Sequence, residues 1–158
     1  MTGLTLEQLN DRVAISDVLH RYCRAIDTKD WALLETVFVE DMEADFTSFA
    51  GRDVVRGRDN WLSAIRLTIS GLEATQHLTG NHTITLDGDS AALRADLQAV
   101  HILANPRGDG EYTVGGWYDI DCVRTADGWR VKRYKLTVRW SRGNRDILRI
   151  AAKAAAAG

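Results

Sequence analysis

The chain has 158 residues, 45% of them hydrophobic and 27% charged, which suits one soluble domain with a core of its own. Its 20 basic and 22 acidic residues nearly cancel, so the composition excludes a strong general attraction to nucleic acid or to an anionic membrane. It has no apolar run of about 18 residues, and no basic segment precedes an apolar stretch at the N-terminus, so we expect neither a membrane span nor a signal peptide.

Cysteines and short motifs limit the chemistry further. Cys23 and Cys122 lie far apart in the sequence and form no metal-binding spacing, so we expect buried thiols in a cytoplasmic protein. The sequence contains no glycine-rich phosphate loop, no serine nucleophile elbow and no zinc signature. We therefore expect neither a cofactor nor a metal.

Helical periodicity dominates the beginning of the chain. Thr5 and Gln8 have the spacing of a capping box. Apolar residues then recur every three or four positions, which predicts a helix over residues 6–27. Asp30 can cap a second helix over residues 31–38.

Shorter elements follow these two helices. Residues 42–46 alternate between apolar and polar, which indicates a short strand, and residues 51–57 indicate a turn with a brief strand. Apolar residues four positions apart, from Trp61 to Ile69, predict a third helix ended by Gly71.

The second half of the chain changes to alternation with a period of two. It predicts long strands over residues 75–86, 91–103, 111–124 and 129–140. An alanine-rich tail, residues 144–157, favours a short final helix. Helices followed by a run of antiparallel strands indicate an α+β domain. Because long strands that contain glycine tend to bend, we expect a curved sheet that helices close into a cone.

Two polar residues of the first helix are candidates for a site. Tyr22 lies on the apolar stripe of the helix, and Asp27 lies at its C-terminal end, where the helix dipole disfavours an anion. Asp27 is either solvated there or turned into the interior. Its unfavourable position hints at a functional use.

Two histidines on different strands are further candidates. Regular alternation places His77 and His82 on opposite faces, and Ile84 and Leu86 favour the face of His82 as the buried one. His77 is then an exposed strand residue unless its own face lines a cavity. His101 shares a face rich in Leu and Ala, so it is either a hydrogen-bonded core histidine or a residue that faces a ligand.

Large aromatic residues also allow two interpretations. Trp61 and Trp140 belong either to the core or to a pocket for a flat hydrophobic molecule. Trp117 and Asp119 share a strand face with Asp121. Two acids in this arrangement are typical of a solvent face, although the tryptophan argues for a buried one.

Several stretches resemble a known family. "IDTKDW", "QHLTGNH", "QAVHIL" and "VRWSRGNRDILRI" are similar to segments of the nuclear-transport-factor-2-like (NTF2-like) superfamily, in its polyketide-cyclase-like (SnoaL-like) branch. The motifs are most similar to those of scytalone dehydratases and bile-acid dehydratases. The resemblance spans about residues 5–150 of a single domain, residues 1–158. It implies a cone-shaped α+β barrel, with three N-terminal helices on a strongly curved antiparallel sheet and a short C-terminal helix.

The resemblance also implies roles for particular residues. It assigns the active-site acid to Asp27, the two active-site histidines to His77 and His101, and a tyrosine of the bile-acid dehydratases to Tyr22. Scytalone dehydratases have a tyrosine immediately before the acid, where this chain has Ile26. Tyr22, about one helical turn away, could take that role. We expect substrate-binding contacts from Trp61, Trp117, Asp119 and Trp140.

The implied function is that of a cofactor-independent lyase. A dehydratase of this kind would act on a cyclic or polycyclic hydrophobic small molecule by general acid–base elimination at the Asp–His pair. The alternatives are an isomerase or cyclase of the ketosteroid-isomerase or polyketide-cyclase type, and a non-catalytic module that binds small molecules. The resemblance further implies a homo-oligomer, a dimer or trimer. From the charge balance we expect no nucleic-acid or membrane partner.

Overall fold

Helices dominate the first half of the chain and long strands the second half, in a computed structural model that describes residues 3–51 and 53–157. The predicted long strands agree with the observed ones to within three residues at each end. The elements, in chain order, are α1 (Leu6–Thr28), α2 (Trp31–Glu35), β1 (Phe38–Asp45), α3 (Thr47–Ala50), β2 (Val55–Arg56), α4 (Arg58–Ile69), β3 (Ala74–Asp87), β4 (Ser90–Ile102), β5 (Glu111–Thr125), β6 (Gly128–Gly143) and α5 (Asp146–Ala157).

The six strands form one curved sheet in the order β2-β1-β6-β5-β4-β3, and this sheet stays open rather than closing into a barrel. Four of the five neighbouring pairs are antiparallel, but β1 and β6 are parallel. The predicted curved antiparallel sheet is therefore confirmed except at the β1–β6 pair, which is parallel. A long connection rather than a hairpin separates β1 from β6, so the two strands are free to run in the same direction.

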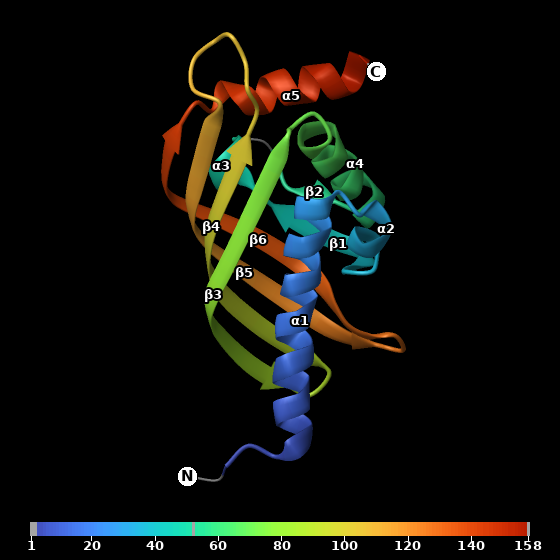
Figure 1. The fold of residues 1–158 in the computed structure, drawn as a ribbon. Coiled ribbons are helices and arrows are strands. Elements are labelled where there is room, and N and C mark those ends of the chain that lie inside the picture. Colours follow the sequence, from blue (N-terminus) through green and yellow to red (C-terminus); the bar gives the residue numbers. More distant parts are fainter. Residues whose placement is uncertain (1–2, 52, 158) are drawn as a thin grey trace.

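The helices cover the sheet as the sequence predicts. Figure 1 shows α1 running along the sheet beside β3, with α5 across one end of the fold near α4. The capping box at the start of α1 is confirmed, because Gln8 N–H donates to Thr5 Oγ1 and Thr5 N–H donates to Gln8 Oε1. None of the helices in the described part of the chain is long and apolar enough to cross a membrane.

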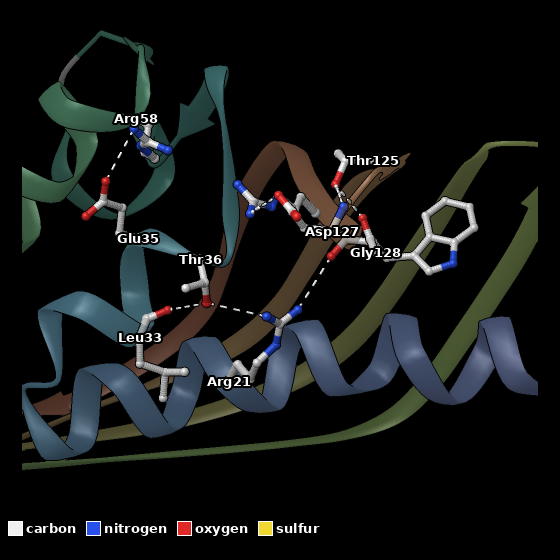
Figure 2. Close-up of polar contacts among 10 residues, drawn as sticks. Arg21, Leu33, Glu35, Thr36, Arg58, Thr125, Asp127 and Gly128 are labelled. Atoms are coloured by element: carbon white, nitrogen blue, oxygen red, sulfur yellow. Dashed lines mark hydrogen bonds and ion pairs between the residues drawn. The ribbon is translucent and has the colours of Figure 1, made fainter.

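Arg21 joins α1 to two other parts of the fold (Figure 2). Its Nη1 donates to the Thr36 hydroxyl at 3.4 Å, and its Nη2 donates to the Trp129 carbonyl oxygen at 3.5 Å. The Thr36 hydroxyl in turn donates to the Leu33 carbonyl oxygen. The middle of α1 is therefore held against both α2 and the start of β6, which fixes the helix that carries Tyr22.

Two predicted helix ends differ from the structure. The second helix ends at Glu35 instead of residue 38, because Phe38 already pairs with β6 and the residue before it is β-branched. The third helix ends at Ile69, and Gly71 is not its left-handed cap. Gly71 is required for another reason: a Cβ there would lie 2.1 Å from the carbonyl oxygen of Ala151 in α5.

The brief strand expected within residues 51–57 is confirmed as β2, although Arg52, in the part of this stretch where a turn was expected, lies outside the described residues. Both cysteines are buried free thiols, as predicted. Burial raises the pKa of the Cys23 thiol and of the Cys122 thiol to about 12, so both stay protonated at neutral pH.

A bulge in β3 changes which side chains face the helices. The register with β4 shifts between Gly80 and Thr83, and Asn81 adopts a left-handed φ of 52°. The extra residue reverses the alternation, so that His77 and His82 both point toward α1. The prediction that these two histidines lie on opposite faces is therefore wrong.

A second bulge acts in the same way in β6. Asp121 pairs with Arg133 but Cys122 pairs with Val131, so Lys132 is an extra residue on this strand. Regular alternation would point the side chain of Tyr134 away from the core, yet it is buried. The two bulges thus place His77 and Tyr134 in the interior, although simple alternation assigns both side chains to the exterior.

Candidate active site

The end of α1 directs Asp27 toward β3. Lys29 adopts a left-handed conformation (φ 55°) that ends the helix, and its ammonium group donates to the Leu72 carbonyl oxygen at 2.6 Å. Asp30 instead accepts the Leu33 backbone N–H at 2.9 Å and caps α2. In the stretch "IDTKDW", Asp30 therefore caps the next helix, and Asp27 faces the sheet.

Asp27 makes three hydrogen bonds to β3. Its Oδ1 lies 2.7 Å from His77 Nδ1 and accepts from the Thr75 hydroxyl at 2.9 Å. Its Oδ2 accepts from the His77 backbone N–H at 2.8 Å. The side chains of His77 and Asp27 are only 7% and 23% exposed, so the pair is largely withdrawn from solvent.

Electrostatics fix the proton of the His77 ring. Burial by itself would raise the pKa of Asp27, but hydrogen bonds from the His77 ring and backbone and from Thr75 outweigh burial and lower this pKa. The charged carboxylate accepts a hydrogen bond from Nδ1, so the neutral imidazole has its proton on Nδ1 and its lone pair on Nε2. This arrangement prepares Nε2 of His77 to act as a general base.

His101 lies beside His77 but is held differently. The two ring centroids are 5.9 Å apart and nearly perpendicular, and His101 Nδ1 donates to the Tyr112 carbonyl oxygen at 3.1 Å. Burial, together with the nearby charge of His77, lowers the pKa of His101 to about 4, so the ring is neutral at pH 7. A neutral ring that donates through Nδ1 can only accept through Nε2.

Three buried tyrosines form a cluster, and one of them, Tyr22, lies beside His77. The Tyr22 ring lies 6.3 Å from the His77 ring, 4.8 Å from Tyr134 and 6.1 Å from Tyr118. Burial raises the pKa of all three phenols above the ordinary value, so they remain protonated donors at neutral pH. The site therefore combines a base with a group of hydroxyl donors.

The aromatic cluster extends from the tyrosines to Trp61. Phe46 lies 4.6 Å from Trp61 and 5.3 Å from Tyr134, measured between ring centroids. The Trp61 indole nitrogen and the Tyr134 hydroxyl are buried and have no hydrogen-bond partner among the described residues. Trp61, predicted to bind substrate, thus lies within the interior cluster.

Three other predicted binding residues lie away from this cluster. Trp117 and Asp119 are on the opposite face of β5 from Tyr118. There, the indole nitrogen of Trp117 donates to Asp119 at 3.1 Å, and Arg94 pairs with the same carboxylate at 2.6 Å. Trp140 is 46% exposed and covers Gly115. The structure does not bring these three side chains to the Asp27–His77 pair.

Residues that the sequence did not single out complete the site. Thr75 orients Asp27, and Tyr118 and Tyr134 supply two of the three phenols. Only Tyr118 could have been found from the pattern, because it lies on the regularly alternating inward face of β5. In residues 3–51 and 53–157, no three His, Cys, Asp or Glu side chains are grouped so that they could hold a metal ion.

Comparisons with known proteins agree with this fold. A family model described as a SnoaL-like domain matches residues 7–135. The protein Rv2910c from Mycobacterium tuberculosis is 34% identical over 134 residues, which cover 82% of this chain and 86% of that protein. The crystal structure of the Kfla4162 protein from Kribbella flavida superimposes with a TM-score of 0.84 and 31% identity, covering 89% of this chain and 97% of its own.

Several structural neighbours have enzyme names. Hexachlorocyclohexane dehydrochlorinase LinA-type3 from Novosphingobium barchaimii has a TM-score of 0.75 at 14% identity, covering 89% of this chain and 94% of its own. At this identity the comparison shows a shared fold only. The family match, in contrast, extends over most of the chain, and the protein belongs to the SnoaL-like domain family of the NTF2-like superfamily.

Proposed function

We propose that the protein is a lyase that removes water from a cyclic or polycyclic hydrophobic compound with a hydroxyl group next to a carbonyl-activated C–H bond. The observation that carries this proposal is the 2.7 Å contact between Asp27 Oδ1 and His77 Nδ1. The contact turns Nε2 of a sheltered histidine into a base. The dehydrochlorinase among the structural neighbours is named for a related elimination, that of hydrogen chloride.

The proposed reaction uses one histidine twice. Nε2 of His77 takes the proton from the carbon beside the carbonyl, and the electron pair of the C–H bond moves into an enolate. The enolate then re-forms the carbonyl while the bond between the β-carbon and the hydroxyl oxygen breaks. The proton now on Nε2 passes to the departing hydroxyl and gives water. The charge of Asp27 stabilises the imidazolium formed between the two steps.

The other buried groups have complementary roles in this proposal. A phenol of the cluster, with Tyr22 nearest to His77, donates a hydrogen bond to the enolate oxygen as its charge develops. Neutral His101 accepts a hydrogen bond from the leaving hydroxyl and so orients it. His101 does not hold the carbonyl oxygen of the substrate in this proposal, because its donor nitrogen, Nδ1, already donates to the Tyr112 carbonyl oxygen.

The experiment is a screen of cyclic β-hydroxy ketones by mass spectrometry, with wild type, Asp27→Asn, His77→Gln and Asp30→Asn. A dehydratase gives a product lighter by the mass of one water. We expect His77→Gln to lower kcat by roughly 10²–10⁴-fold. Asp30→Asn is the matched control in the same stretch, since asparagine caps a helix as well as aspartate does, and it should retain wild-type activity.

The alternatives predict different results in the same experiment. An isomerase or cyclase gives a product of unchanged mass but altered ultraviolet absorption or NMR spectrum. A binding module gives no product, and Asp27→Asn then binds the ligand as tightly as wild type does. Either result contradicts the dehydratase proposal. A primary isotope effect with substrate deuterated beside the carbonyl would show that removal of this proton limits the rate, and the loss of activity in His77→Gln would then assign the removal to His77.

A further inference from the structure

A second pair of histidines lies outside the candidate active site, in a cleft of about 420 Å³ between α1 and β3. From α1 come Arg12, Ser16 and His20, which are four positions apart and therefore share one face of the helix. From β3 comes His82, whose ring lies 5.4 Å from that of His20. None of these side chains takes part in the reaction proposed above.

Two nitrogens in this cleft are buried without a hydrogen-bond partner among the described residues: Nε of Arg12 and Nε2 of His82. His82 Nδ1 lies 3.0 Å from the Ser16 hydroxyl. Burial, with the charge of His20, lowers the pKa of His82, so the ring is neutral at pH 7. When the Ser16 hydroxyl donates to Nδ1, the ring proton is on Nε2, and the cleft then contains two buried donors that lack acceptors.

The walls of the cleft define the kind of acceptor that fits. Arg12 brings a permanent positive charge, whereas Val13 and Ile84 provide apolar surface. The acid in the lining, Asp17, is 63% exposed and lies 3.4 Å from His20 Nδ1, so its charge is at the rim of the cleft. An oxyanion attached to an apolar body matches this combination of donors, charge and surface.

We propose that this cleft is a second binding site, one for a small organic carboxylate. A small shift of the Arg12 and His82 side chains exposes the two buried nitrogens, so that the carboxylate oxygens accept from Nε of Arg12 and Nε2 of His82, and the apolar part lies against Val13 and Ile84. The volume is within the range of about 300–1,000 Å³ that is usual for sites of small molecules. The proposal is independent of the dehydratase reaction, because it uses no residue of that site.

The test is an NMR titration with benzoate that follows the ring signals of the four histidines. We expect saturable shifts of His82 and His20, and an affinity for neutral benzamide at least ten-fold weaker. Arg12→Gln should raise the Kd for benzoate at least ten-fold. Arg24→Gln, on the exposed surface of the same helix, should leave the Kd unchanged.

Further variants separate this cleft from the active site and from loss of folding. Val13 is 63% exposed, so Val13→Asp should fold normally and weaken benzoate binding by charge repulsion. Asp27→Asn should bind benzoate as wild type does. Equal Kd values for wild type, Arg12→Gln and Val13→Asp would overturn the proposal. Benzoate shifts confined to His77 and His101 would overturn it as well.

Discussion

Asp27 and His77, fifty positions apart in the sequence, are joined by two contacts, one to the imidazole and one to the backbone N–H of the same residue. The carboxylate therefore orients the ring and at the same time holds β3 against the end of α1. The geometry of the proposed base depends on this helix end, where Lys29 makes the turn and Thr75 supplies a third hydrogen bond. Stability and activity should consequently be coupled at Asp27.

His101 should make the stability of the protein depend on pH. Its pKa is about 4 in the folded protein but about 6.5 in the unfolded chain, so between these values only the unfolded chain binds the proton. The free energy of unfolding should therefore fall as the pH decreases from about 6.5 to 4, by about 3 kcal/mol in total. Urea denaturation at several pH values measures this slope.

The matched variant for this prediction is His101→Gln, which removes the titrating group. Its free energy of unfolding should depend less on pH in the same window, although it should be lower than that of wild type at pH 7, since the carbonyl oxygen of Tyr112 loses a well-placed donor. If wild type and variant showed the same slope between pH 6.5 and 4, the buried neutral state of His101 would be refuted.

The tyrosine cluster should support catalysis through its hydroxyl groups. Tyr22→Phe keeps the ring that packs on Tyr134 but removes the donor nearest to His77. We expect kcat to fall by roughly 10²-fold with little change in KM, because the lost hydrogen bond forms mainly in the transition state. Steady-state kinetics on the substrate found in the screen measure this effect. A raised KM with unchanged kcat would show that Tyr22 only binds the substrate.

The bulge in β3 should tolerate glycine but not a β-branched residue at position 81. Asn81 adopts a left-handed φ of 52°, which glycine accepts without strain. Asn81→Val should cost about 1–2 kcal/mol of stability relative to Asn81→Gly. Urea denaturation gives both values. Equal stability of the two variants would mean that β3 can pair regularly with β4 and that the bulge is not needed.

Close packing of α5 should make Gly71 sensitive to the smallest substitution. A methyl group at this position would overlap the carbonyl oxygen of Ala151, so Gly71→Ala should lower the stability by about 1–3 kcal/mol. Gly80→Ala is the control, because no atom lies within 4 Å of the added carbon. Thermal unfolding gives the melting temperature of each variant for this comparison. The contact with α5 would be irrelevant to stability if both melted at the same temperature.

Periodicity and motifs predicted different parts of this structure. The long helix and the long strands were found correctly, because each repeats its apolar pattern over many residues. The face of His77 on β3 was not, since a single extra residue reverses the alternation and leaves no signal in composition. The inward position of His77 therefore could not be derived from alternation, and only the motif resemblance pointed to it.

The resemblance correctly predicted that the residues it named for the candidate site lie close together. The residues that only the fold brings to the site were missed. Asp27, His77, His101 and Tyr22 come together as expected. The remaining phenols come from neighbouring strands, and their proximity depends on strand register, which one sequence does not define. The homo-oligomer stays a prediction, and the mass of the native protein from light scattering would test for a dimer or trimer.

The most direct test of the central claim is the protonation of His77, measured by long-range ¹H–¹⁵N NMR of the histidine rings in wild type and Asp27→Asn at neutral pH. We predict that neutral His77 in wild type has its proton on Nδ1 and its lone pair on Nε2, and that Asp27→Asn loses this preference. A proton on Nε2 in wild type, or an identical ring spectrum in both proteins, would contradict the proposed base and with it the elimination mechanism.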